Sequence, residues 1–94
     1  EQVEAFSRIE NHYFVNGGFF THEDQLLDGV DVIRHIPAVI VQGRYDVICP
    51  MRTAWDLHRA WPEAELVVNT GAGHSMFDPE NAAALVEACD RFRP

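Results

Sequence analysis

The fold of this chain is decided by the stretch VIVQGRYDVICP, residues 39–50. A β-branched apolar run ends at Gly43, Asp46 follows in the turn, and Pro50 opens a pattern with helical spacing. Because the run does not alternate between apolar and polar residues, it predicts a strand over residues 38–42 that is covered on both faces. The stretch therefore predicts a strand–helix unit of a parallel sheet, with an aspartate at the carboxyl end of its strand.

A second unit of the same kind follows. Residues 65–69 predict another buried strand, a glycine-rich turn then carries His74, and a helix is predicted to begin at Asp78 as N-cap with a proline behind it. Residues 51–61, between the two strands, have the apolar spacing of a helix. A strand–helix–strand unit of this length predicts parallel pairing with a right-handed crossover. The last helix is expected to bury an apolar stripe, namely Ala82, Leu85, Val86, Cys89 and Phe92.

The first 36 residues predict helices and a turn. Residues 1–14 have the apolar stripe of an amphipathic helix, and the Asn16-Gly17-Gly18 turn ends it. The adjacent Phe19 and Phe20 are expected to be buried anchors. A second helix is expected over residues 22–33, although Gly29 disfavours it. Because two parallel strands rarely form a sheet alone, the missing strands are expected from upstream sequence or from a partner chain.

Composition narrows the class of protein. The 94 residues are 47% hydrophobic and 23% charged, which predicts one folded domain at most. The net charge of −8 argues against nucleic acid as a partner; it would suit a cationic substrate, but acidity alone more often reflects solubility. No apolar run reaches the length of about 20 residues of a membrane span, and no signal peptide is visible. Two cysteines without CxxC spacing indicate reduced thiols in a cytoplasmic protein.

Asp46 and His74 are the candidate catalytic residues. Both follow strands at their carboxyl ends, where open α/β sheets bind ligands. An aspartate in that position can accept a hydrogen bond from one imidazole nitrogen and leave the other free to take a proton from a nucleophile. Taken singly, Asp46 could be a turn residue and His74 a loop histidine. Their arrangement in neighbouring strand–helix units favours the paired interpretation.

A nucleophile is not evident in the chain. In α/β-hydrolases the serine lies in a G-x-S-x-G elbow ahead of the aspartate and the histidine. Ser7 lies in a helical pattern without flanking glycines, and Ser75 directly follows His74. The cysteines are not in elbows either, so the nucleophile is expected outside the chain. No metal is expected, because the remaining histidines lack metal-ligand spacing: His12, His22, His35 and His58. No cofactor is expected either.

Four motifs occur in order along the chain: RIENHYF at residues 8–14, GRYDVICP at 43–50, AWDLH at 54–58 and GHS at 73–75. With these motifs the chain resembles the C-terminal part of proline iminopeptidases, which are α/β-hydrolase enzymes of the serine peptidase type. The resemblance implies an α/β fold that is the C-terminal part of an α/β-hydrolase. Residues 1–36 would be the end of the helical cap, and residues 37–94 the last two parallel strands with flanking helices.

The resemblance also implies a reaction, the release of N-terminal proline from peptides. Asp46 and His74 would be the acid and base of a triad, Glu10 would bind the cationic imino nitrogen of the proline, and Cys49 would line its pocket. Without the resemblance, Glu10 could be a solvated helix residue and Cys49 a small residue packed at a helix start. Two alternatives remain open: another α/β-hydrolase, such as an esterase or epoxide hydrolase, and an inert, non-catalytic fragment.

Overall fold

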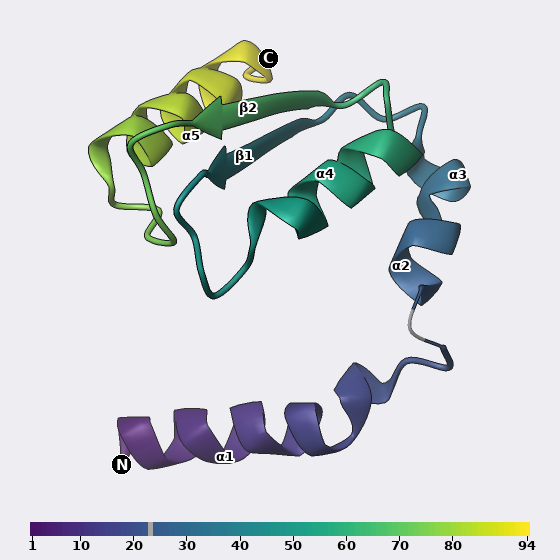
Figure 1. Ribbon diagram of the computed structural model, residues 1–94, viewed down its shortest axis with the longest axis vertical. Coiled ribbons are helices and arrows are strands. Elements are labelled where there is room, and N and C mark those ends of the chain that lie inside the picture. The colour runs from purple at the N-terminus through teal and green to yellow at the C-terminus, as the bar shows by residue number, and fades with distance from the viewer. Residues whose placement is uncertain (23) are drawn as a thin grey trace.

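Two parallel strands form the sheet of the computed structural model, which describes residues 1–22 and 24–94 (Figure 1). The strands are β1 and β2, and the helices are α1 to α5 with one 3-10 turn, η1. In chain order the elements are α1 (Gln2–Val15), η1 (Gly17–Phe19), α2 (Gln25–Asp28), α3 (Val30–Ile33), β1 (Val39–Gly43), α4 (Met51–Ala60), β2 (Glu65–Asn69) and α5 (Pro79–Arg91).

The sheet has the predicted parallel pairing. Its register runs from Val39 opposite Glu65 to Gly43 opposite Asn69. Alternate side chains of a strand point to opposite faces, and the two faces of β1 meet different helices. Ile40 lines a hollow with α4, whereas Val39 lines one with α5. The prediction of a parallel strand–helix–strand unit covered on both faces is therefore confirmed.

The hydrophobic core lies between the sheet, α3 and α4. Val30, Trp61 and Ala64 are its buried members, and Ile40 and Leu57 pack against them. The indole nitrogen of Trp61 donates a hydrogen bond of 3.3 Å to a backbone carbonyl at the end of α3. This core fixes α4 against the sheet and so fixes the loop that leads from β1 into α4.

The region between α1 and the sheet differs from two expectations. The helix expected over residues 22–33 is two single turns, α2 and α3, which divide at Gly29 because glycine disfavours a helix interior; residue 23 lies outside the described residues. The expected burial of Phe19 and Phe20 is wrong, because both rings are about half exposed. Phe19 has a φ of 63° and packs on Tyr13 of α1 at a ring distance of 5.3 Å, away from the core.

The apolar stripes of the first and last helices are also largely exposed. On α5, small residues such as Ala84 and Ala88 face the sheet, while Val86 of the expected stripe is 62% exposed. Small side chains let the helix approach a sheet of two strands, and no other described element covers the stripe. On α1, Phe6 is 67% exposed. Figure 1 shows α1 lying apart from the sheet, below the loops at the strand ends. None of the described helices is long and apolar enough to cross a membrane.

Candidate active site

Two loops at the carboxyl ends of β1 and β2 form the candidate active site. The loop after β1 carries Asp46 and the loop after β2 carries His74. Their backbones are joined directly, because Tyr45 donates its N–H to the carbonyl of Ala72 at 3.0 Å. The parallel register of the strands thus continues into the loops and holds the two side chains at one edge of the sheet.

Gly43 allows the two loops to approach this closely. A Cβ atom at Gly43 would lie 2.1 Å from the carbonyl oxygen of Gly73 and 2.7 Å from that of Ala72. Both contacts are to backbone, so no side-chain rotation could relieve them. The site therefore requires glycine at the last position of β1.

Asp46 is held by three hydrogen bonds. One carboxylate oxygen accepts the backbone N–H groups of Ile48 and Cys49 at 3.0 and 2.8 Å, and the other lies 2.9 Å from Nδ1 of His74. The Asp46 side chain is 8% exposed. Burial alone would raise the pKa of this carboxyl, but the hydrogen bonds from Cys49, His74 and Ile48 outweigh it and lower the pKa.

The ionised carboxylate determines the state of the histidine. An ionised carboxylate can only accept hydrogen bonds, so Nδ1 of His74 must carry the proton in this pair. In the neutral ring Nε2 is then the acceptor. Half of the His74 side chain is exposed. The arrangement can therefore take up a proton at Nε2 while Asp46 stabilises the resulting cation.

The start of α5 holds the His74 loop in place. Asp78 stands at the N-cap position as predicted, but its side chain makes no capping bond to the helix and instead accepts the N–H of Gly73 at 2.8 Å. Asn81, which the sequence analysis missed, donates to the carbonyls of Gly73 and Ser75 at 3.1 and 2.9 Å. Its signal in the sequence was weak, since an asparagine in the first turn of a helix is common on surfaces.

Gln42 holds the Asp46 loop and was also missed. This buried residue of β1 donates its side-chain amide to the carbonyls of Gly43 and Cys49 at 3.0 and 2.9 Å. A glutamine inside an otherwise apolar strand was the available signal. A buried amide needs hydrogen-bond partners, and the loop that follows the strand provides them.

Cys49 lies beside the Asp46–His74 pair. Reactive atoms of these three residues lie within 4.8 Å of one another, a spacing that a metal ion could bridge. Both carboxylate oxygens of Asp46 are already engaged, however, which leaves little capacity for an ion. The expectation of no metal stays a prediction. Both cysteines are free thiols.

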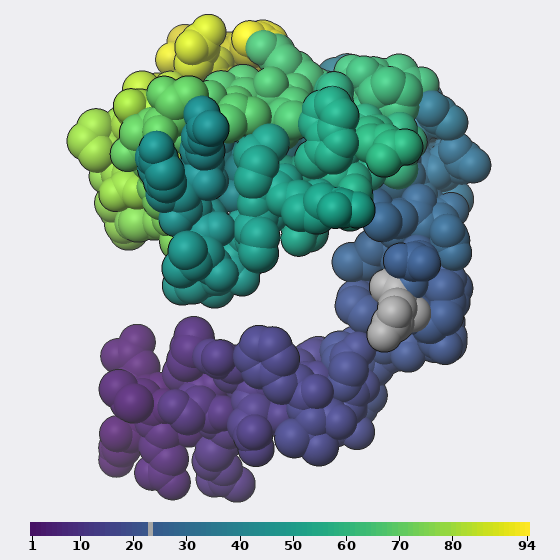
Figure 2. Space-filling model, in the orientation of Figure 1, coloured from purple at the N-terminus to yellow at the C-terminus, as the bar shows by residue number. Residues whose placement is uncertain are grey.

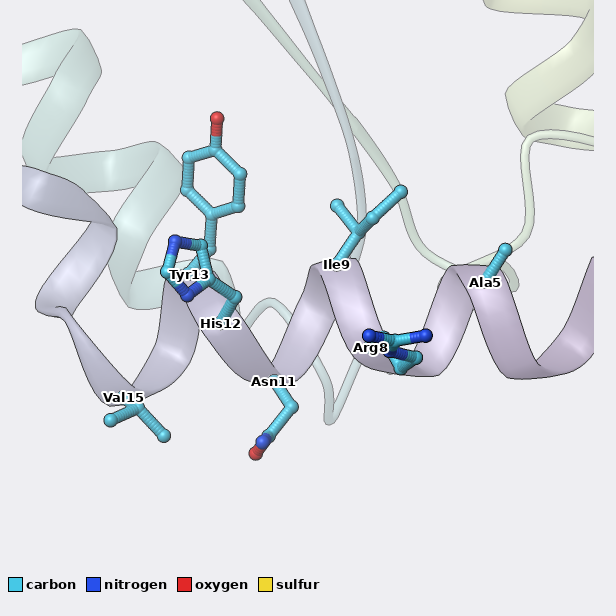
Figure 3. A pocket seen from close by; sticks show the side chains of 7 residues that line it. All are labelled: Ala5, Arg8, Ile9, Asn11, His12, Tyr13 and Val15. Atoms are coloured by element: carbon cyan, nitrogen blue, oxygen red, sulfur yellow. The ribbon is translucent and has the colours of Figure 1, made fainter.

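Glu10 is not brought to the pair. It lies exposed on α1, in a hollow with Tyr13, Phe14 and Phe20. Figure 2 shows open space between α1 and the loops at the strand ends. Figure 3 shows side chains of α1 between Ala5 and Val15, where Tyr13 points to one side of the helix and Val15 to the other. The structure therefore joins Asp46, Cys49 and His74, and leaves Glu10 on a separate element.

A family model and several curated relatives agree on the family of this chain. A family described as TAP-like protein matches residues 12–92. The chain is 65% identical over 88 residues to a proline iminopeptidase of Xylella fastidiosa, a match that covers 94% of this chain and 28% of the relative. It is 62% identical to one of Arabidopsis thaliana (95% and 23%) and 54% identical to one of Neisseria gonorrhoeae (96% and 29%). These relatives confirm the resemblance predicted from the motifs, and the chain spans about a quarter of their length.

Proposed function

The chain belongs to the TAP-like family of α/β-hydrolases, and on this premise we propose that it is the C-terminal part of a serine aminopeptidase that releases N-terminal proline. The observation that carries the proposal is the 2.9 Å contact between Asp46 and Nδ1 of His74 at the carboxyl ends of adjacent parallel strands. The identity to proline iminopeptidases supports the substrate class.

In the proposed reaction, a serine from upstream sequence attacks the carbonyl carbon of the N-terminal proline. Nε2 of His74 takes the hydroxyl proton, and Asp46 holds the opposite nitrogen and stabilises the imidazolium. His74 then gives that proton to the departing amine as the peptide bond breaks. Water attacks the resulting acyl-enzyme with His74 again as base, which releases proline and restores the serine. Backbone N–H groups outside this chain would stabilise the oxyanion.

Substrate selection is assigned to Glu10 and Cys49. The imino nitrogen of an N-terminal proline is cationic at neutral pH, and enclosing it without a partner would be costly. Glu10 offers a carboxylate in a hollow whose other side chains are mainly aromatic, which suits a charged, apolar ring. Cys49, next to Asp46 and His74, would line the pocket for the proline ring.

The proposal extends to the architecture. Residues 1–36 would end a helical cap, and residues 37–94 would complete the hydrolase core. Upstream sequence would cover the exposed apolar faces of α1 and α5 and pair with the free edge of the sheet. The protein would be cytoplasmic, act on peptides, and bind neither nucleic acid nor membrane.

The first test uses the full-length protein and a prolyl amide that releases a fluorophore. We expect His74→Ala to lower kcat by at least about 10³-fold, because both proton transfers are lost. The control is His22→Ala, which removes an exposed histidine on another segment and should leave kcat unchanged. Activity retained in His74→Ala would refute the role of this residue.

The second test addresses Glu10. We expect Glu10→Gln to raise KM for prolyl substrates about 10- to 100-fold with a smaller effect on kcat, because a charge-assisted contact worth about 1.5–3 kcal/mol is lost. Glu4→Gln on the same helix is the matched control. An unchanged KM in Glu10→Gln, together with faster cleavage of simple esters than of prolyl amides, would favour the esterase alternative.

A further inference from the structure

Asn81 is one of the few buried polar residues of the described chain, with 5% of its surface exposed. Its amide nitrogen donates to the carbonyls of Gly73 and Ser75, the residues on either side of His74. Its amide oxygen accepts a hydrogen bond of 2.9 Å from the side chain of Asn69, at the end of β2. Both donor hydrogens and the acceptor are thus engaged, and the amide orientation is fixed by its partners.

The contacts of Asn81 differ from those of its neighbours. Glu80 accepts the N–H of Gly71 from an exposed position, and Asp78 accepts the N–H of Gly73. Each of these two acidic side chains contacts the loop through one N–H group ahead of His74. Asp78 also contacts Ser75, but through its own backbone N–H, at 3.1 Å. Among the side chains that the structure describes, Asn81 is the one that bonds the backbone both before and after the histidine, and its oxygen connects it to β2 through Asn69.

We propose that Asn81 is a positioning residue for the catalytic base: it sets the backbone on both sides of His74 and thereby the placement of the imidazole between Asp46 and the substrate. The assignment rests on the proposed function. The reason is that a shift of the backbone beside His74 also moves its imidazole, and a displacement of about 1 Å in a catalytic group lowers the rate about 10²-fold. The His74 side chain itself is half exposed, so its position depends on its backbone and on Asp46.

The test compares Asn81→Ala with Glu80→Gln in the full-length protein. We expect Asn81→Ala to lower kcat about 10- to 100-fold with KM within about twofold, after correction for the folded fraction measured by circular dichroism. Glu80→Gln should keep both constants near the wild type. A role in stability alone would lower the melting temperature while leaving kcat per folded molecule unchanged, and that result would overturn the proposal.

A second readout does not depend on activity. The proton between His74 Nδ1 and Asp46 should give a low-field resonance in the proton NMR spectrum of the wild type, and Asn81→Ala should broaden or abolish it. If the wild type does not cleave prolyl amides, the proposed function fails, and this resonance alone decides whether Asn81 positions the imidazole. A resonance unchanged in Asn81→Ala would overturn the positioning role.

A milder variant guards against misfolding. Asn69→Ala removes only the donor that anchors the Asn81 oxygen. We expect it to change kcat and the resonance in the same direction as Asn81→Ala, by a smaller factor of about three- to tenfold. If Asn81→Ala does not fold, Asn69→Ala decides the question, and wild-type values for both readouts would overturn the proposal.

Discussion

The substitution Gly43→Ala tests how the site is assembled. The added methyl would meet the carbonyl oxygen of Gly73 at 2.1 Å and that of Ala72 at 2.7 Å. Real Cβ contacts stay beyond 3.0 Å, so the two loops must part by about 0.9 Å before the methyl fits. Neither oxygen belongs to a side chain that could turn aside, so the backbone itself has to move.

The size of the effect follows from that displacement. Separating the loops by this amount stretches the 2.9 Å contact between Asp46 and His74 beyond hydrogen-bond range. Misplacing a catalytic group by about 1 Å costs about 10²-fold in rate. Forcing a methyl into a closely packed position also destabilises a fold by about 1–3 kcal/mol. We therefore expect kcat to fall about 100-fold and the free energy of unfolding to decrease by about 1–3 kcal/mol.

The assay measures prolyl amide hydrolysis and urea unfolding of the full-length protein. Gly73→Ala is the matched control: it adds the same methyl directly beside His74, but its nearest contacts would be ordinary ones of 3.6 and 3.9 Å. This control should remain within about threefold of the wild-type rate. A Gly43→Ala protein as active and as stable as Gly73→Ala would refute the idea that close approach of the loops determines the site.

Three further predictions concern stability and are measured on the full-length protein. Gln42→Ala removes a buried amide that donates to the carbonyls of Gly43 and Cys49, and should cost about 1–3 kcal/mol in urea unfolding. Trp61→Ala should lower the free energy of unfolding by about 3–5 kcal/mol in the same measurement, because it leaves a cavity in the hydrophobic core beside α4. The lowered pKa of Asp46 stabilises the fold above the ordinary carboxyl range, and this contribution is lost as the pH falls below about 4. Melting curves at pH 7 and pH 3 should therefore differ less for Asp46→Asn than for the wild type.

The sequence predicted the central elements well, because their signals are local. The strand over residues 65–69 was placed without error and the strand at 39–43 within one residue, since β-branched runs between turn residues leave few alternatives. The pairing of Asp46 with His74 followed from the rule that parallel strands end at a common edge.

The errors about burial have one physical origin. An apolar pattern shows which side chains favour burial, but not which element covers them. The stripe on α5 and the rings of Phe19 and Phe20 are exposed because no other described element packs over them. The side chain of Asp78 illustrates a second limit. A carboxylate can accept an N–H from its own helix or from a neighbouring loop, and only the folded chain decides between them.

The candidate site has two parts, the Asp46–His74 pair and Glu10, and different parts of the chain hold them in place. Within the part of the chain that the structure describes, the hydrogen bonds that fix the Asp46–His74 pair come from residues 42–81, in the strand–helix–strand unit and the start of α5. Glu10, by contrast, lies on α1, which packs mainly on η1. The Asp46–His74 pair is therefore preformed by local contacts, whereas the position of Glu10 depends on what holds α1. Substitutions at Gly43 and Asn81 should accordingly act on kcat, and Glu10→Gln should act on KM. The two effects should combine additively, because Glu10 lies on a separate element from the other two residues.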